Sequence, residues 1–380
     1  MLGIPVEGLP ETRRHGVPRA VITGWGKCVP PLRLTNADLE QLCDTSDEWI
    51  VERTGISERR ISHVEATDLA ELAGRRALAC AGVDAADLDL IVVASCTPEI
   101  LCPTMAAMLE ERLGAANAAA FDLNAACSGF AYSTSVVTGM IESGFARKVL
   151  VVGAEKLRFI MDYRDRSTCI LFGDGAGAAV FEASGSDECG DGAGVLSVDL
   201  GADGDQGKTM VWTHMGSKGD PSRTIDPDDA RLHFEGQAVF KIAVQGIAGS
   251  ASRALERAGL TADDVDLVVP HQANARIIES ATRRLRIDPD RVFTNIAHHG
   301  NTAAASIPMA LHDALDEGRI SPGDLVVLTA FGGGVTWGSV VLRWGDRVEP
   351  LGAYEGELPP TDATVFDLLQ PNLDFFAPEG

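Results

Sequence analysis

The chain contains an internal repeat, and this repeat constrains its fold more than any other feature. The segment Ala81–Val92 aligns with Ala258–Val269, so position 81 corresponds to position 258 at an offset of 177 residues. In each copy the end of a helix leads through a turn into an apolar run typical of a strand. A second pair, Lys148–Ala154 and Asp324–Ala330, aligns at nearly the same offset, and both segments resemble strands buried on both faces of a sheet. The sequence therefore predicts two similar α/β halves.

The boundaries of these halves follow from local composition. Turn-forming residues between positions 184 and 194 separate an N-terminal half at 18–190 from a C-terminal half at 191–345. Residues 1–17 are rich in Pro, Gly and charge and are expected to form a flexible leader. Residues 346–380 form an acidic extension in which Arg347 is the one basic residue. Apolar segments around Val365 and Leu373 could dock this extension on the body.

Charge and composition exclude several classes of protein. A net charge of −23 argues against nucleic acid or an anionic membrane surface as a partner, because either needs a broad basic face. No apolar run reaches the ~18 residues of a membrane span and no signal segment is evident, so we expect a cytoplasmic protein without a membrane partner. Eight cysteines without a CxxC pair fit neither a zinc site nor a disulfide scaffold.

Cys127 lies among small residues where an extended run turns into a helix. Backbone N–H groups and the positive end of a helix dipole favour a thiolate there, which predicts a pKa lowered from ~8.5 to about 3.5–7.5. The small side chains of Ala126 and Ser128 leave space for a ligand to reach the sulfur. A buried structural thiol is the alternative for any single cysteine.

The repeat brings two further polar residues toward Cys127. Its offset carries position 127 to position 304, inside Gly300–Ser306, so the two segments are predicted to be paired strand-to-helix junctions. Asn301 lies in that segment. His271 directly follows an apolar strand, at the end where α/β proteins hold ligands. A nucleophile with two hydrogen-bond donors can hold a thioester carbonyl and stabilise an enolate, whereas capping roles are the alternative for the histidine and the asparagine.

Three other motifs resemble parts of ligand-binding sites. The glycine segment Phe331–Gly338 lacks a GK[ST] ending and is predicted to bring a backbone N–H to an oxyanion rather than to bind phosphate. Gly173–Ala178 lacks the GxGxxG spacing and is expected to allow close packing of a helix on a strand. His298, His299 and His312 have no complementary ligands at standard spacing, so no metal site is predicted.

Seven motifs in this order resemble the β-ketoacyl-acyl-carrier-protein synthase III family, the condensing enzymes that start bacterial fatty-acid synthesis, within the thiolase superfamily. The motifs are Thr45–Val51, Arg53–Ile56, Ala126–Phe130, Phe172–Ala178, Pro270–Asn274, His299–Thr302 and Phe331–Gly338. The resemblance extends from Val21 to Trp344. It implies an α/β thiolase fold with duplicated halves in a five-layered αβαβα sandwich, a homodimer, and a catalytic triad of Cys127, His271 and Asn301.

The resemblance also implies the reaction. Cys127 would take an acyl group from acyl-CoA, and malonyl-acyl-carrier protein would then decarboxylate and attack the acyl-cysteine. Coenzyme A would be part of a substrate, with no permanently bound cofactor, and the N–H groups of Cys127 and Gly333 would form the oxyanion hole. A specialised acyltransferase or starter-unit ketosynthase of secondary metabolism is the alternative. Degradative thiolases need a second cysteine near the C-terminus, whereas the last cysteine here is Cys189.

Substrate contacts can be carried over by the same resemblance. The coenzyme A contacts would be Trp49, Arg53, Arg166 and Asn274. The basic patch that receives an acidic carrier protein would consist of Lys241, Arg276, Arg283 and Arg284, although a solvated helix face is the alternative for the last two. Cys102 stands where the family often has a bulky aromatic residue that gates the far end of the acyl pocket across the dimer interface. A smaller residue leaves more volume in the pocket, which predicts that branched or longer acyl primers are accepted. Burial of each added methylene contributes ~0.8 kcal/mol of binding free energy.

Overall fold

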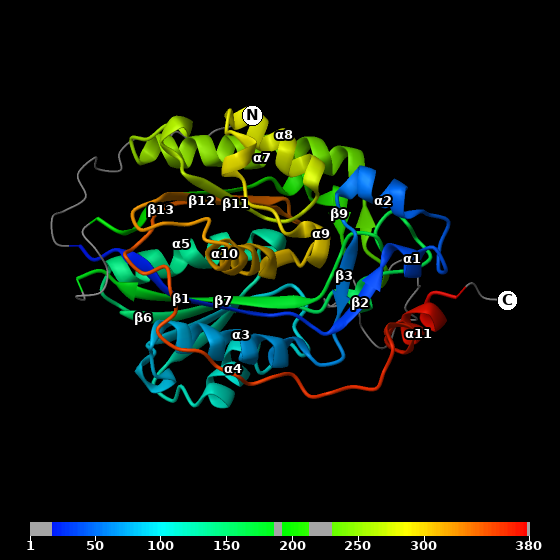
Figure 1. Cartoon of the computed structure of the whole chain (residues 1–380), viewed down its shortest axis with the longest axis horizontal. Helices are drawn as coiled ribbons and strands as arrows, with labels where there is room; N and C mark the ends of the chain where they lie inside the picture. The colour runs from blue at the N-terminus through cyan, green and yellow to red at the C-terminus, as the bar shows by residue number, and fades with distance from the viewer. Residues whose placement is uncertain (1–16, 186–191, 213–229, 378–380) are drawn as a thin grey trace.

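The computed structural model describes residues 17–185, 192–212 and 230–377, arranged in five layers (Figure 1). Helices α7 (Gly236–Arg257) and α8 (Ala275–Leu285) form one outer layer, and α3 (Ala66–Ala81) and α4 (Met105–Leu113) form the other. Two sheets lie inside these layers, and a pair of helices separates the sheets. The five-layered α/β fold implied by the resemblance is confirmed. Apart from residue 17, the predicted leader lies outside the described residues.

Each sheet is built from strands of its own half of the chain. The first sheet has the order β1 (Ala20–Cys28), β7 (Gly175–Ala183), β6 (Lys148–Glu155), β4 (Leu90–Ala94) and β5 (Ala119–Leu123). The second has the order β11 (Leu267–Pro270), β12 (Leu325–Gly332), β13 (Thr336–Arg343) and β8 (Gly194–Ala202). The polypeptide passes from one sheet to the other between residues 183 and 194, and residues 186–191 of that passage lie outside the described ranges.

The two sheets share one pattern of strand directions, as the repeat predicts. Strand β4 runs parallel to β6 and β11 runs parallel to β12, while β7 and β13 pair antiparallel beside them. In the second sheet, the position equivalent to that of β5 is occupied by the segment at Val292, which forms a single parallel bridge with Val268 of β11. Both copies of the first repeat segment consist of a helix end, a short 3-10 turn and a buried strand. The predicted duplication is confirmed.

The inner helices α5 (Gly129–Glu142) and α10 (Ser306–Asp316) begin at matching junctions. Each follows a 3-10 turn, Ala126–Ser128 before α5 and Ala303–Ala305 before α10. Ala126 and Ala303 both have left-handed backbones, with φ of 47° and 44°. Such angles are strained for a residue with a Cβ and persist only where the surroundings impose them. Because the two alanines are related by the repeat offset, the junctions are the predicted symmetric pair.

Glycines allow the inner helix α10 to lie close to β7. A Cβ on Gly175 would come within 2.9 Å of Met309 Sδ, and one on Gly177 within 2.6 Å of the Met309 backbone nitrogen. Any larger residue in these positions would push α10 away from the sheet. The prediction that Gly173–Ala178 serves helix-to-strand packing is confirmed.

Shorter elements surround the junctions at one end of the layers (Figure 1). They are α1 (Asn36–Leu39), α2 (Asp47–Thr54), α9 (Ile296–His299), β2 (Leu32–Thr35), β3 (Glu58–Ile61), β9 (Met210–Val211) and β10 (His233–Phe234). Within the described ranges, no helix combines the length and the apolar character that crossing a membrane requires.

The acidic extension folds back along the body and ends in helix α11 (Val365–Phe375). Val365 and Leu369 are buried in an apolar cluster that also contains Leu34 and Cys127. Arg158 links the helix to the core, because its Nη1 donates to the carbonyl of Leu368 at 2.6 Å. The predicted docking of the apolar segments is confirmed.

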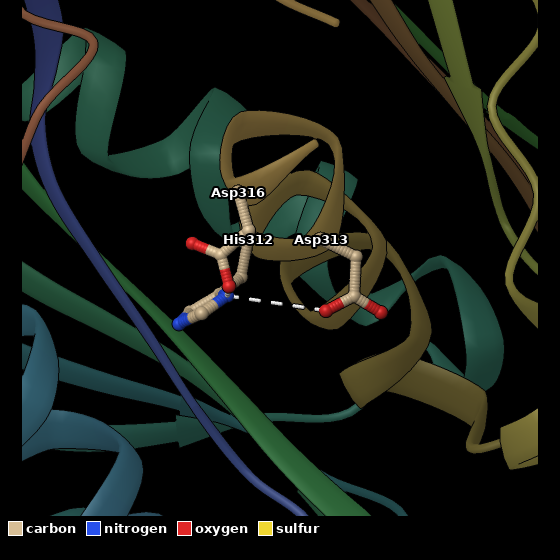
Figure 2. Close-up of side chains that lie close together, drawn as sticks. All are labelled: His312, Asp313 and Asp316. Carbon is tan, nitrogen blue, oxygen red and sulfur yellow. Dashed lines mark ion pairs between the residues drawn. The ribbon is translucent and has the colours of Figure 1, made fainter. Parts of the chain in front are cut away.

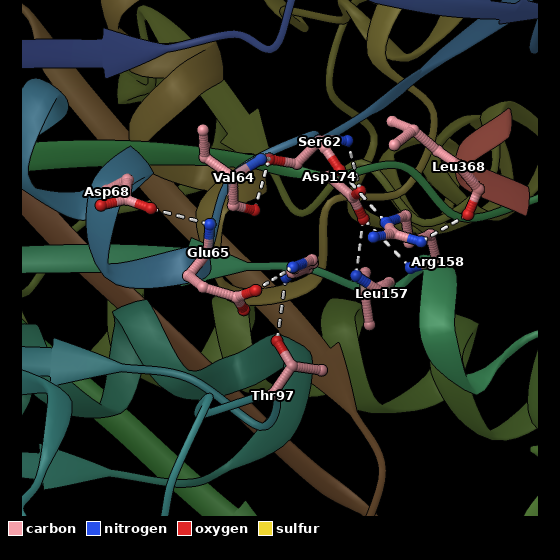
Figure 3. A network of polar contacts seen from close by, with 10 residues as sticks. Ser62, Val64, Glu65, Asp68, Thr97, Leu157, Arg158, Asp174 and Leu368 are labelled. Carbon is pink, nitrogen blue, oxygen red and sulfur yellow. Dashed lines mark hydrogen bonds and ion pairs between the residues drawn. The ribbon is translucent and has the colours of Figure 1, made fainter. Parts of the chain in front are cut away.

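Arg158 is itself held by a buried carboxylate (Figure 3). Asp174 accepts hydrogen bonds from the backbone nitrogens of Leu157, Arg158 and Ser62 at 2.6, 3.1 and 2.7 Å. The Arg158 Nε also donates to the carbonyl of Ser62 at 3.1 Å. This network ties the loop after β6 to β3 and to the docked helix α11.

Candidate active site

The three predicted catalytic side chains line one cavity of about 500 Å³. Cys127, His271 and Asn301 are 8%, 1% and 6% exposed, so they belong to its buried part. Asn301 and Cys127 come from the paired junctions, and His271 follows the end of β11. The duplicated fold therefore brings together residues that are 174 positions apart, from 127 to 301, in the sequence.

The glycine segment after β12 is fixed to the turn that carries the cysteine. A Cβ on Gly332 would lie 2.8 Å from the backbone nitrogen of Cys127, so only glycine permits this approach. The Thr336 Oγ1 donates to the carbonyl of Ala125 at 3.0 Å. A Cβ on Gly333 would lie 3.6 Å from the Cβ of Ala126, which places the backbone of Gly333 beside the same turn.

The predicted low pKa of Cys127 is wrong. Burial raises the pKa of its thiol to about 12, and the negative charge of Glu155 acts in the same direction. Loss of hydration outweighs the favourable backbone N–H, because a thiolate away from water depends on the few dipoles around it. The resting group is therefore a thiol, and its proton must leave when an acyl group arrives.

Glu155 was not found from the sequence, although it is fully buried near Cys127. Its carboxyl accepts from Ser95 Oγ at 3.2 Å, from the Cys96 backbone nitrogen at 3.1 Å and from Thr97 Oγ1. Burial raises its pKa to about 7, so neutral and charged forms both occur near physiological pH. It is the last residue of β6 and follows an apolar strand in the sequence, so no local pattern marks it as a neighbour of the nucleophile.

His271 is held as a neutral imidazole. Burial lowers its pKa to about 3. Its Nδ1 lies 2.6 Å from Ser306 Oγ, and the same oxygen accepts the Gln272 backbone N–H at 3.4 Å. The Ser306 hydroxyl can donate its proton to Nδ1 while its oxygen accepts the Gln272 N–H, and we assign this arrangement, which leaves the ring proton on Nε2. This tautomer offers an N–H donor to a substrate oxygen.

Hydrogen bonds to its backbone and to its side chain fix the orientation of Asn301. Its backbone N–H donates to the carbonyl of Leu171 at 2.8 Å, and its carbonyl accepts from Gly173 at 3.0 Å. The side-chain Oδ1 accepts the Ala303 N–H at 2.9 Å. Because the oxygen of the amide is occupied in this way, its NH₂ group is the end suited to donate to a ligand.

The side chains predicted to contact coenzyme A are less buried and line the same cavity. The guanidinium groups of Arg53 and Arg166 lie 4.6 and 5.0 Å from the centre of the Trp49 ring. The Asn274 Nδ2 donates to the carbonyl of Arg53 at 3.0 Å, while its Oδ1 caps α8 at the Arg276 nitrogen. All four predicted coenzyme A contacts and Arg276 line this cavity.

A second cavity of about 380 Å³ meets the first at Cys127. Its walls are mainly apolar and include Ile160, Trp212 and Leu232, and Gly333 lies on its surface. Cys102 is exposed and is not among the described residues that line either cavity, whereas the neighbouring Leu101 lines the second one. Cys102 therefore lines neither of these two cavities of its own chain; in the prediction it closes the cavity of the other subunit of a dimer.

Two comparisons of sequence identify relatives of the chain. The family model described as 3-oxoacyl-[acyl-carrier-protein (ACP)] synthase III matches residues 121–204, and the model of its C-terminal part matches residues 255–344. A β-ketoacyl-[acyl-carrier-protein] synthase III 2 of Vibrio cholerae is 44% identical over 352 residues, which is 92% of this chain and 95% of the relative. The chain belongs to the β-ketoacyl-[acyl-carrier-protein] synthase III family.

Other members of the synthase III family agree in sequence and structure. A synthase III of Roseiflexus castenholzii is 49% identical over 330 residues, 86% of this chain and 98% of the relative. The crystal structure of 3-oxoacyl-[acyl-carrier-protein] synthase III from Aquifex aeolicus VF5 has a TM-score of 0.78 and 42% identity, covering 86% of this chain and all of that one. This chain is therefore an acyltransferase of the condensing type.

The residues of the predicted carrier-protein patch lie at different distances from the cavity in this synthase III. Lys241, Arg276, Arg283 and Arg284 are all exposed on α7 and α8, and Arg276 reaches the first cavity. Arg283 lies seven positions further along α8, about 10 Å away by helical rise, where it pairs with Glu279 at 3.6 Å. Arg276 thus lies at the cavity, whereas Arg283 lies about two helical turns further along α8.

A polar cluster on α10 has the residue types of a metal site (Figure 2). The His312 Nδ1 lies 3.2 Å from Asp316 and 3.9 Å from Asp313. Asp313, however, already contacts Lys27 Nζ, and it accepts a hydrogen bond from Asn295 at 2.7 Å. Burial opposes ionisation of Asp313, but its bonds with His299 and Lys27 hold its pKa below the usual value. An internal cation therefore neutralises this carboxylate in the structure.

Replacing Ser306 with alanine is expected to lower the condensation rate about 10- to 100-fold, because the His271 ring would lose the bond that fixes its tautomer. Acylation of Cys127 should remain close to that of the parent enzyme. A threonine replacement keeps the hydroxyl and should restore most of the rate. Separate assays of acyl-enzyme mass and of condensation would show this; equal losses in both steps would contradict the positioning role.

Proposed function

We propose that this protein loads an acyl group from acyl-CoA onto Cys127 and condenses it with malonyl-acyl-carrier protein, starting fatty-acid synthesis. The observation that carries the proposal is one cavity lined by a buried cysteine, a neutral histidine and an oriented asparagine, with Trp49 and two arginines in its wall. The names of the relatives support the same reaction. We expect the enzyme to work in the cytoplasm.

The first half-reaction is acyl transfer. The Cys127 sulfur attacks the thioester carbonyl, the new S–C bond forms, and the bond to the coenzyme A sulfur breaks. The thiol proton leaves with the coenzyme A thiol, so the step needs no net acid or base. The backbone N–H groups of Cys127 and Gly333 would stabilise the oxyanion, and the packing of Gly332 on the cysteine turn keeps that backbone close.

The second half-reaction is decarboxylative condensation. The Nε2–H of His271 and the amide of Asn301 would donate to the malonyl thioester oxygen while the bond to the carboxylate breaks. Carbon dioxide leaves, its bonding electrons form an enolate, and the enolate carbon attacks the acyl-cysteine. The Cys127 sulfur then departs as a thiolate and takes up a proton from solvent. A histidine that stays neutral suits this role, because it donates without protonating the carbanion.

The acyl chain would extend into the second cavity. Ile160, Trp212 and Leu232 give this space an apolar wall, and burial of each methylene there is worth ~0.8 kcal/mol. With Cys102 of the other subunit closing the cavity in place of a large aromatic side chain, branched or longer primers are favoured over acetyl-CoA. The family's homodimer would place this region at the interface between two subunits.

Trp49 would stack on the adenine of coenzyme A, with Arg53 and Arg166 binding phosphate groups. Asn274 would contact the pantetheine arm. Lys241 and Arg276 would receive the acidic carrier protein near the cavity, and Arg283 and Arg284 would extend this surface along α8.

A starter-unit ketosynthase is the second candidate. The priming β-ketosynthase from the R1128 polyketide pathway has a TM-score of 0.79 and 35% identity, covering 89% of this chain and 99% of that one. The two functions share the loading chemistry and differ in the carrier protein that receives the product.

The test is intact-protein mass spectrometry after incubation with acetyl-, isobutyryl- and longer acyl-CoA. A single added acyl mass is expected, with faster loading for the larger primers. Condensation assays with fatty-acid and polyketide carrier proteins then separate the two candidates. A protein that gains no acyl mass from any thioester would refute both, and strict acetyl preference would refute the gate argument.

A further inference from the structure

Two cysteines outside the catalytic cavity lie close enough to react with each other. Cys43 Sγ and Cys169 Sγ are 3.8 Å apart although the residues are 126 positions apart in the chain. Cys43 lies in the loop between α1 and α2, and Cys169 lies in the loop that follows β6. Both are free thiols in the structure.

The two thiols have unequal environments. Cys43 is half-buried, whereas Cys169 is buried. A hydrogen bond from Cys169 lowers the pKa of Cys43 although burial opposes the shift, and the nearby Arg166 charge acts with it. That same bond, together with burial, raises the pKa of Cys169. Cys43 is therefore the more nucleophilic and more accessible thiol, and Cys169 is placed to resolve a mixed disulfide.

The pair joins the two walls that present Trp49 and Arg166. Cys43 is followed by Asp44, whose carbonyl accepts a hydrogen bond from Arg166 Nη1 at 2.7 Å. Arg166 in turn lies 5.0 Å from the centre of the Trp49 ring. On the other side, Ile170 follows Cys169 and lines the catalytic cavity.

We propose that Cys43 and Cys169 form a reversible thiol–disulfide modification site that controls the shape of the coenzyme A entrance. Forming the bond requires the sulfur atoms to approach from 3.8 Å to ~2.05 Å. A movement of this size shifts the two loops against each other and displaces Arg166 from its place over Trp49. The effect on acyl-CoA rests on the proposed function of this cavity, whereas formation of the disulfide does not.

Glutathione disulfide or a similar small disulfide is the oxidant. The Cys43 thiolate attacks one sulfur of the small disulfide and releases one thiolate, leaving a mixed disulfide on Cys43. The Cys169 thiol then loses its proton and attacks Cys43 Sγ, which releases the second small thiol. Two protein thiols are oxidised and one disulfide is reduced to two thiols, so electrons and protons balance.

The site can be tested in a Cys127→Ala background, which removes the catalytic thiol from the reaction. After treatment with glutathione disulfide, peptide mapping should show a crosslink between Cys43 and Cys169 and a loss of two hydrogen masses, both reversed by dithiothreitol. Adding Cys43→Ser should abolish the crosslink, and adding Cys80→Ser, a buried cysteine on α3, should leave it intact. An unmodified Cys43, or a mixed disulfide that Cys169 does not resolve, would overturn the proposal.

Calorimetry on the same proteins tests the functional consequence. The crosslinked protein should bind acyl-CoA about tenfold more weakly than the reduced protein, as expected from losing one stacking or cation–π contact. Binding of an acyl-pantetheine, which lacks the nucleotide, should change little. A crosslinked protein with unchanged affinity for acyl-CoA would refute control of the entrance. A reduced protein that binds no acyl-CoA would instead refute the proposed function and leave the mapped crosslink as the test of the site.

Discussion

Replacing Cys127 with alanine is expected to abolish formation of the acyl-enzyme and to lower condensation about 10⁴- to 10⁶-fold, the range seen when a covalent nucleophile is removed. The expectation follows from geometry, since Cys127 lines both cavities. The loss should appear in kcat with every acyl-CoA. Intact mass spectrometry and a condensation assay measure the two effects independently.

Cys80→Ala is the matched control for this prediction. Cys80 is also a buried cysteine with a pKa raised by burial, to about 11, but it lies in α3 on the outer layer. The control should keep both acylation and condensation. Acylation that survives in Cys127→Ala would move the nucleophile to another residue. Cys96, which also lines the second cavity, would then be examined first.

Replacing His271 with alanine is expected to separate the two half-reactions. Acylation of Cys127 should continue, whereas decarboxylation and condensation should fall about 10²- to 10³-fold, as when one donor of an oxyanion site is removed. Asn301→Ala should give the same pattern, and the double variant should lose less than the product of the two effects because both donors serve one oxygen. Release of carbon dioxide from malonyl-carrier protein measures this step.

The low pKa of His271 adds a test based on pH. Because the folded-state pKa is about 3 against an ordinary value of 6.5, the ring stays neutral from pH 8 down to about pH 4. The unfolded chain takes up a proton near pH 6.5, so this residue makes folding less favourable as pH falls from 6.5 toward 3. The pH profile of the condensation rate should therefore contain no titration near pH 6.5 that is present in the parent enzyme and missing from the His271→Ala variant. Such a titration would mean that the imidazolium form takes part in the reaction.

Much of the site could be predicted because the chain repeats itself. The offset pairs the Cys127 junction with the segment around position 304, and both junctions have the same left-handed alanine. The place of His271 followed from a simpler rule, because side chains at the ends of buried strands meet ligands. These features depend on local order along the chain.

Other parts of the site depend on contacts between segments that no local pattern connects. Ser306 begins α10 and looks like an ordinary helix residue, yet its hydroxyl orients His271. Glu155 ends an apolar strand, and its charge adds to burial, the main cause, in raising the pKa of Cys127. The helix dipole can be inferred from the sequence and favours a thiolate. The loss of water around the sulfur is a property of the folded structure and has no local sequence signal.

Because Cys127 lines both cavities, the proposed reaction would follow a fixed order. An acyl chain held in the second cavity would leave the first free, so the same passage would serve the donor and then the extender. Coenzyme A would have to depart before the carrier protein arrives, which would make the kinetics ping-pong, with free coenzyme A competing against the carrier. The length of the primer that the enzyme accepts would then be limited by the second cavity, and the rate at which substrates exchange would be limited by the first.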